Sequence, residues 1–181
     1  MRLFFWFVVF VWWAVDMRVF IMGKKTKYDF TEKKTKYIVI GLIFTGVTLS
    51  LLQPNVIRNT IEGDLNSIQI AGIFVVLAGV IVRLLSVFTL GRFFTPDISV
   101  VKNHRLVTTG LYRWSRHPGY AGEIISFAGL AMIFNMLPAS FFIFFFPLTA
   151  FIYRAVAEEK KLLQVFGKEY EQYMKKTRRF L

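Results

Sequence analysis

The stretch RHPGYAGEIISFAGLAMIFNMLPASFFIFFF, residues 116–146, passes from charged and turn-forming residues into two apolar runs. The runs extend over about 119–135 and 138–157 and are separated only by Asn-Met-Leu-Pro. Each run is long enough, or nearly so, to cross the ~30 Å hydrocarbon core of a bilayer as a helix. Because Pro138 interrupts a continuous helix, the stretch predicts a tight helical hairpin in a membrane.

Three more apolar stretches lie upstream, at about 2–22, 36–52 and 68–90. The chain has 181 residues, of which 55% are hydrophobic, and its 21 Phe include runs that are unusual in soluble domains. No cleavage site of small residues follows the first stretch, which is therefore expected to be retained as a helix. The sequence predicts a single all-α integral membrane domain, residues 1–181, with about five transmembrane helices.

The basic residues are concentrated in three polar segments. Segment 23–36 holds six Lys, segment 91–118 holds five Lys or Arg, and the tail 154–181 holds eight. With five crossings these segments fall on the same side, which the positive-inside rule assigns to the cytoplasm, with the N-terminus outside. The expected location is the plasma membrane of a prokaryote or, in a eukaryote, the endoplasmic reticulum. Topology and lipid head groups account for the net charge of +12, so nucleic-acid binding is not expected.

The chain has no Cys and two His. This composition excludes disulfides, thiolate chemistry and zinc or iron–sulfur sites with Cys ligands. A His-rich site is not expected either, so no metal partner is predicted.

Residues 90–125 are too polar and turn-rich to lie in lipid and too aromatic to form a free loop. Pro118 fits the first turn of the following helix, where its missing N–H costs nothing. The free N–H groups of that turn, with Arg116 and His117 beside them, suit an anionic or carboxylate-bearing ligand. Tyr112 and Tyr120 offer ring faces to a cation or an adenine. The alternative is a belt of Arg, Trp and Tyr that only anchors the helix at the interface.

The second polar region, residues 153–180, contains Arg154 and Glu158, which are four residues apart and therefore share one face of a helix. Arg154 stands at the cytoplasmic end of the fifth predicted helix. An arginine that only snorkels to the interface is the alternative there. Farther on, Tyr170 and Tyr173 fall on one side of an amphipathic stretch, which predicts a C-terminal helix packed at the membrane surface.

Together the two regions resemble the isoprenylcysteine carboxyl methyltransferase family, which is related to phospholipid methyltransferases. The ordered motif is HRLVTTGLYRWSRHPGYAG, residues 104–122, followed by RAVAEEKKLLQVFGKEYEQY, residues 154–173. The resemblance covers residues 90–175. It implies a membrane-embedded enzyme that uses S-adenosylmethionine without a Rossmann domain and releases S-adenosylhomocysteine. The chain accordingly contains no GxGxxG motif.

The resemblance also implies roles for individual residues. Arg154 and Glu158 would be the catalytic pair, and Arg154 and Arg116 would meet the substrate. The cofactor pocket, on the cytoplasmic side, would be formed by Lys102, His104, Arg105, Leu106, Val107, Gly110, Tyr112, His117, Pro118, Gly119, Tyr120, Glu158 and Glu159. In this scheme residues 1–66 form N-terminal helices and residues 67–181 form the catalytic core.

This sequence departs from the family pattern in three places. The spacing before His104 is shorter, which affects the assignment of Lys102. Glu123 stands where the family has an apolar or aromatic residue, and the tail ends Thr-Arg-Arg-Phe-Leu without the family's later Pro. The last two departures leave the identity of the methyl acceptor open.

The expected partners are the bilayer and a lipophilic methyl acceptor, such as a prenylated cysteine or a phospholipid. A carboxylate acceptor is ionised at neutral pH and needs no general base, but near lipid it needs neutralisation, which the planar fork of Arg154 provides. Carboxyl methylation of an isoprenylcysteine-like or other lipophilic acceptor is therefore the expected activity. The alternatives are a phosphatidylethanolamine N-methyltransferase with Glu158, Glu159 or Glu123 as base, a methyltransferase of a small hydrophobic acid or thiol, and a non-enzymatic membrane protein.

Overall fold

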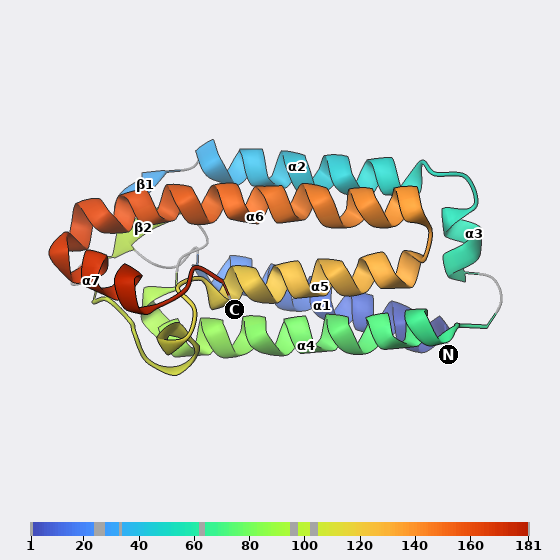
Figure 1. The fold of residues 1–181 in the computed structure, drawn as a ribbon, viewed down its shortest axis with the longest axis horizontal. Coiled ribbons are helices and arrows are strands. Elements are labelled where there is room, and N and C mark those ends of the chain that lie inside the picture. Colours follow the sequence, from blue (N-terminus) through green and yellow to red (C-terminus); the bar gives the residue numbers. More distant parts are fainter. Residues whose placement is uncertain are drawn as a thin grey trace.

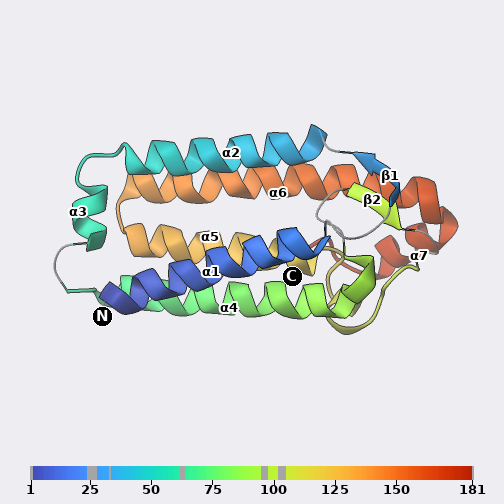
Figure 2. The same ribbon diagram turned by 180° about the vertical axis from the view of Figure 1, so that it is seen from behind.

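The computed structural model describes residues 2–23, 28–32, 34–61, 64–94, 98–101 and 105–180. Five long helices run side by side along the long axis of the molecule (Figures 1 and 2). They are α1 (Arg2–Gly23), α2 (Lys34–Leu51), α4 (Ser67–Leu90), α5 (Pro118–Phe134) and α6 (Leu137–Phe166). Each of them coincides with a predicted apolar stretch, which confirms the membrane fold built of helices.

Length and composition single out three of the described helices, α2, α4 and α6, as able to cross a membrane. Helix α5 is equally apolar but has 17 residues. Large apolar side chains such as Phe44, Phe74 and Phe88 stay exposed on the outer faces of α2 and α4. Such exposure suits lipid rather than water.

Helix α6 continues to Phe166, nine residues beyond the apolar run that ends near residue 157. The added residues are mostly Glu, Lys, Leu and Gln, which favour helix. The helix ends at Gly167, whose φ of 51° is disfavoured for other residues. The predicted amphipathic C-terminal helix follows as α7 (Lys168–Lys176), which buries Tyr170 and Tyr173.

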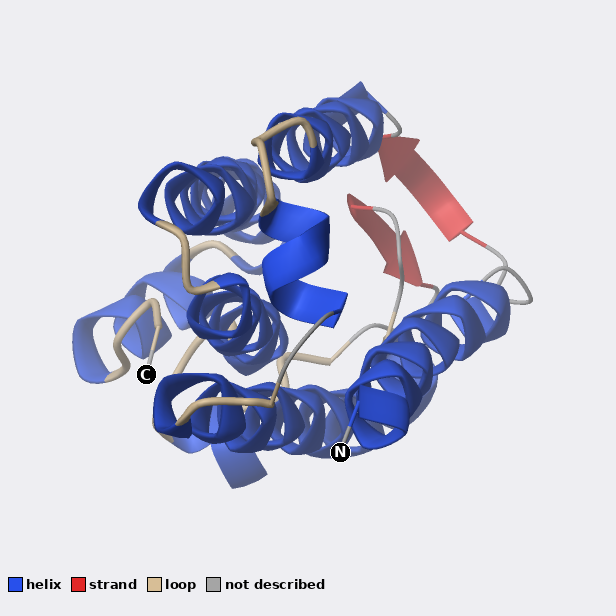
Figure 3. Ribbon diagram, turned by 90° about the vertical axis from the view of Figure 1, so that its right-hand side faces the viewer, coloured by secondary structure: helices blue, strands red, loops and turns tan. Residues whose placement is uncertain are grey.

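Two short strands, β1 (Tyr28–Glu32) and β2 (Ile98–Val101), pair antiparallel and were not predicted from the sequence. Viewed along the bundle, they lie on the side between α1 and α2 (Figure 3). The short elements are α3 (Val56–Ile61), η1 (Gly91–Phe93) and η2 (Gly110–Arg113). The strands, η2 and α7 lie at one end of the bundle and α3 at the other (Figure 1). The described parts of the three basic segments therefore share one end.

Helices α4 and α5 are in close backbone contact through two pairs of glycines. A Cβ added to Gly79 would lie 2.6 Å from the carbonyl oxygen of Gly122, and one added to Gly72 would lie 2.7 Å from that of Gly129. In each helix the two glycines are seven residues apart, so they lie on one face. Small residues at such positions let membrane helices approach closely enough for extensive van der Waals contact.

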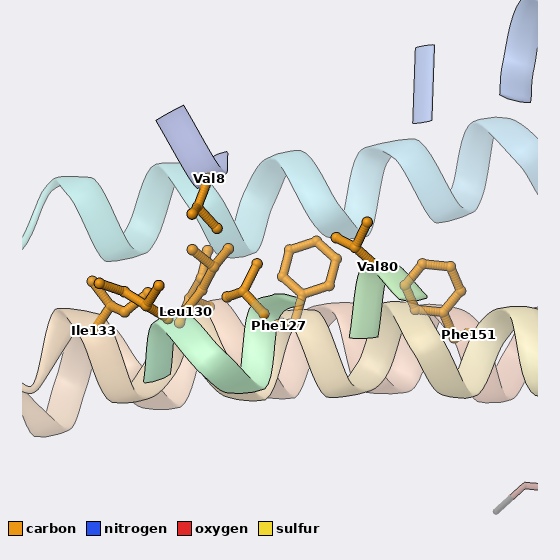
Figure 4. Packing of buried hydrophobic residues seen from close by; sticks show 9 residues of the cluster. Val8, Val80, Phe127, Leu130, Ile133 and Phe151 are labelled. Atoms are coloured by element: carbon orange, nitrogen blue, oxygen red, sulfur yellow. The ribbon is translucent and has the colours of Figure 1, made fainter. Parts of the chain in front are cut away.

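The apolar core joins α1, α4, α5 and α6. Val8 of α1, Val80 of α4, Phe127 of α5 and Phe151 of α6 are all buried in one cluster (Figure 4). Trp12 packs edge-on against Phe127, with ring centroids 5.0 Å apart. These contacts place α1 against the face of α4 and α5 from which the site is built.

Candidate active site

A cavity of about 280 Å³ lies at the end of the bundle that carries β1, β2, η2 and α7. Every long helix and α7 contribute to its wall. The lining residues that were predicted as site residues are Arg105, Leu106, Val107, Tyr112, Arg116, His117, Gly119, Tyr120, Arg154 and Glu158. We call this the main cavity.

Three predicted site residues are not among the described residues that line the main cavity: Gly110, Pro118 and Glu159. Lys102 and His104 lie outside the described residues. The wall also contains residues that were not predicted as part of a site, namely Asp16, Lys36, Val39, Ile40, Arg83, Ser86, Leu90, Phe94, Phe151, Leu162, Phe166, Tyr170 and Tyr173.

Tyr120 connects the two residues predicted to act as a pair. Nε of Arg154 donates a hydrogen bond to the Tyr120 hydroxyl at 2.8 Å, and that hydroxyl donates to Oε2 of Glu158 at 2.6 Å. The guanidinium carbon of Arg154 lies 5.9 Å from the centre of the Tyr120 ring. Arg154 is 6% exposed, too little for an arginine that snorkels into water. It is therefore held inside the site, facing the main cavity.

His117 stacks on Tyr120 with ring centroids 5.4 Å apart and an interplanar angle of 10°. Its Nε2 lies 3.3 Å from Oε1 of Glu159, and its Nδ1 lies 3.9 Å from Oε2 of Glu158. Both ring nitrogens therefore face carboxylates, and Nε2 is within hydrogen-bond distance of Glu159. Neighbouring carboxylates on α6 thus flank the imidazole.

Glu159 lies behind the wall of the main cavity, where three side chains contact its carboxylate. Its Oε1 lies 3.0 Å from Nη2 of Arg116, and its Oε2 lies 2.8 Å from Nη2 of Arg179. His117 is the third partner. A buried carboxylate requires several such partners to offset its lost hydration, and Glu159 accordingly orients the residues around it.

Two further phenols belong to the wall. The Tyr112 hydroxyl is within 3.1 Å of Ser86 Oγ, and the Tyr173 hydroxyl donates to the backbone carbonyl of Tyr112. Burial raises the pKa of Tyr112 and raises that of Tyr173 to about 12. Both phenols therefore keep their protons at neutral pH, and Tyr173 holds η2 in place by donating its hydrogen bond.

A second cavity, of about 530 Å³, adjoins the main cavity and is mostly apolar. Its wall consists of Val9, Phe10, Trp12, Trp13, Asp16, Ile43, Arg83, Glu123, Phe127 and Phe151. Asp16, Arg83 and Phe151 line both cavities. The two spaces are therefore neighbours that share a wall of one aromatic and two charged side chains.

An ion cluster forms part of this shared wall. Nε of Arg83 lies 2.9 Å from Oε1 of Glu123 and 3.6 Å from Oδ1 of Asp16. Nε1 of Trp12 donates to the other oxygen of Glu123 at 3.3 Å. Ionisable residues in apolar helices are rare and typically mark functional sites. Asp16 and Arg83 are charged residues inside apolar stretches of the sequence, and this pattern could have assigned them to the site.

A family model described as the isoprenylcysteine carboxyl methyltransferase (ICMT) family matches residues 71–164, just over half of the chain. The chain belongs to this family. The matched region contains the residues from Arg83 to Leu162 that line the two cavities. It ends before α7 and the C-terminal tail.

Two relatives illustrate the similarity. A probable protein-S-isoprenylcysteine O-methyltransferase of Oryza sativa subsp. indica is 39% identical over 114 residues, which is 61% of this chain and 59% of the relative. The protein-S-isoprenylcysteine O-methyltransferase of Saccharomyces cerevisiae is 36% identical over 111 residues, 60% of this chain and 46% of the relative. The chain thus spans about half the length of the ICMT relatives that it matches.

A solved ICMT structure has a similar fold. It is the structure of a eukaryotic intramembrane Ras methyltransferase without a monobody, and it superposes with a TM-score of 0.55. The match covers 81% of this chain and 52% of that one, at 22% sequence identity. The arrangement of helices is therefore an ICMT-type fold.

Proposed function

We propose that this ICMT family member is an integral membrane methyltransferase that uses S-adenosylmethionine and methylates the carboxylate of a lipophilic acceptor such as an isoprenylcysteine. The observation that carries the proposal is the position of Arg154. Its guanidinium is buried, is fixed by Tyr120 and faces the main cavity, which adjoins the apolar second cavity. The names of the matched relatives support the same chemistry.

The main cavity fits S-adenosylmethionine in the chemistry of its wall. Tyr112 and Tyr120 offer aromatic faces, Leu106 and Val107 offer apolar contact, and Glu158 offers a carboxylate to a cationic group. Gly119 lets α5 approach Ser86 and Arg83 of the wall, since a Cβ there would lie 2.8 Å from Ser86 Oγ and 3.0 Å from Arg83 Nη1.

When bound in the main cavity, S-adenosylmethionine would supply an electrophilic methyl group for transfer from its sulfur to the acceptor oxygen, with S-adenosylhomocysteine as the leaving group. The protein contributes alignment and charge, which is where catalysis of an in-line displacement comes from. Arg154 grips the acceptor carboxylate through two parallel N–H groups. Tyr120 and Glu158 hold Arg154 in that orientation, and no general base is required because the carboxylate is already ionised.

The second cavity is the proposed compartment for the apolar tail of the acceptor. Its wall is rich in aromatic side chains, and its volume of about 530 Å³ is within the range of about 300–1,000 Å³ typical of ligand sites. We assign the catalytic core to residues 67–181. Residues 1–66 complete the site, because Trp12 and Trp13 of α1 belong to the wall of the second cavity. The basic end of the bundle, with the cofactor pocket, is proposed to face the cytoplasm.

One observation favours a second candidate, a phospholipid N-methyltransferase. Asp16 and Glu123 place two carboxylates beside the single guanidinium of Arg83. An amine acceptor must lose a proton when it is methylated, and a carboxylate close to the acceptor provides a base. Glu123 is buried in the second cavity and would have this role.

The test is transfer of a radiolabelled methyl group by the purified protein in lipid nanodiscs, with an S-farnesylcysteine derivative or phosphatidylethanolamine as acceptor. We expect base-labile methyl ester formation on the farnesylated carboxylate. An Arg154→Ala variant should lose it, and a Lys160→Ala variant should keep it because Lys160 is exposed on the same helix. Label recovered only in the phospholipid amine would favour the second candidate, and no transfer to either acceptor would contradict both.

A further inference from the structure

The C-terminal segment 177–180 runs from α7 back to the start of α5, beside the residues that precede that helix (Figure 1). The backbone N–H of Arg116 donates to the carbonyl of Arg178 at 2.8 Å, and that of His117 donates to the carbonyl of Arg179 at 3.1 Å. Ser115 Oγ also donates to the carbonyl of Arg179, at 3.1 Å. The tail is therefore hydrogen-bonded to the backbone that carries Arg116 and His117.

The side chain of Arg179 adds a fork-like ion pair to this backbone pairing. Its Nε lies 3.1 and 3.2 Å from the two carboxylate oxygens of Glu159, and its Nη2 lies 2.8 Å from Oε2. Glu159 is 4% exposed and uses Oε1 for Arg116 and His117. Hydrogen bonding to Glu159 raises the pKa of Arg179 further, so the pair stays charged.

The tail also contacts the imidazole ring itself. The ring of Phe180 lies 6.3 Å from that of His117, which stacks on Tyr120. His117 is thus bounded by Phe180 from the tail, Glu159 from α6 and Tyr120 from α5. Since the ring of His117 lines the main cavity, the tail contacts a residue of the cavity wall.

We propose that Arg179 is a positioning residue for the methyl-donor site. It orients the carboxylate of Glu159, which in turn fixes His117 and Arg116 at the cavity wall. This inference rests on the proposed function, because it takes the main cavity as the methyl-donor site. It goes beyond the family match, which ends at residue 164 and so does not reach the tail.

The chain offers a matched control in the adjacent Arg178, whose side chain is exposed while its backbone makes the same kind of bond. Arg179→Ala and Arg178→Ala should be compared as full-length proteins in nanodiscs. The readouts are calorimetric binding of S-adenosylhomocysteine and separate KM values for donor and acceptor. In Arg179→Ala we expect affinity for S-adenosylhomocysteine to fall at least about tenfold, because the buried carboxylate of Glu159 loses a charged hydrogen-bond partner. The acceptor KM should stay within about twofold, and Arg178→Ala should match the natural sequence.

Arg179→Lys provides a second, milder variant in case Arg179→Ala yields no folded protein. Lysine keeps the positive charge but lacks the planar guanidinium that contacts both oxygens of Glu159. The affinity of Arg179→Lys for S-adenosylhomocysteine should therefore lie between those of the natural sequence and Arg179→Ala. Equal affinity of the Arg178→Ala and Arg179→Ala variants for S-adenosylhomocysteine would overturn this inference and leave the proposed function standing. A loss in Arg179→Lys that affects donor and acceptor KM equally would also overturn it, because it would indicate general destabilisation. Failure of the natural sequence to bind S-adenosylhomocysteine would refute the proposed function as well.

Discussion

The hydroxyl of Tyr120 accepts a hydrogen bond from Nε of Arg154 at 2.8 Å while it donates one to Glu158. Arg154 and Glu158 are four residues apart on α6 and therefore share one face of that helix. The phenol links this face of α6 to α5 at the wall of the main cavity. The orientation of the guanidinium therefore depends on a hydroxyl group from a different helix.

Tyr120→Phe tests the role of the hydroxyl separately from that of the ring, because it removes only the hydroxyl. The ring contacts with His117 and Phe151 remain, with centroids at 5.4 and 5.7 Å in the natural protein, but the link between Arg154 and Glu158 is lost. We expect kcat/KM for methyl transfer to fall by about 10- to 100-fold, the range for removing a buried hydrogen bond to a charged group. Tyr153→Phe, an exposed phenol on α6, is the control and should have no effect. Unchanged transfer in Tyr120→Phe would mean that Arg154 is oriented by other contacts.

Arg154→Lys tests whether the guanidinium grips a carboxylate. Lysine keeps the positive charge but cannot make two parallel N–H contacts to a carboxylate. We expect a large loss of methyl transfer, with affinity for S-adenosylhomocysteine preserved within a few-fold. Near-normal turnover of a carboxylate acceptor would show that another residue binds it, and would strengthen the amine-acceptor candidate.

Much of the fold was predictable because membrane helices are long and uniformly apolar. The hairpin of α5 and α6 follows from two apolar runs and Pro138, and α7 follows from its amphipathic pattern. The strands β1 and β2 were missed because each is short and their pairing joins segments about 70 residues apart. Local patterns carry no information about such a partner.

The site was predictable where its residues are close in the sequence. The motif around His117 and Tyr120 lies on the wall of the main cavity, as does Arg154. Asp16 and Arg83 could have been suspected as charges in apolar helices, but their meeting with Glu123 depends on how α1 and α4 pack against α5. The role of Arg179 depends on the tail turning back to Glu159, a tertiary contact without a signal in sequence periodicity.

The close contact of α4 and α5 predicts a strong dependence on small residues. In Gly79→Leu the new side chain would begin within 2.6 Å of backbone atoms of α5, so the helices would have to separate. We expect a loss of about 1–3 kcal/mol in the free energy of unfolding, typical of overpacking, measured in mixed micelles with a denaturing detergent. Gly41→Ala, on α2 with no atom within 4 Å of the added Cβ, is the control. Equal stability of both variants would contradict this packing.

The orientation of the bundle can be tested with single cysteines, because the natural chain contains none. Lys175 is exposed on α7, at the basic end. At the other end Asp64 is exposed, and replacing it leaves intact the cap of α4, in which Asn66 and Gln69 exchange hydrogen bonds. In intact cells a membrane-impermeant maleimide should label Asp64→Cys and spare Lys175→Cys.

Both positions should react once the membrane is permeabilised, which controls for burial of the thiol. The expected pattern follows from the Lys and Arg of segments 23–36, 91–118 and 154–181, which the positive-inside rule retains in the cytoplasm. The reverse pattern would place the main cavity outside the cytoplasm, away from cytosolic S-adenosylmethionine. The proposed donor could not then reach the cavity from the cytosol, so this labelling experiment tests the cofactor assignment together with the topology.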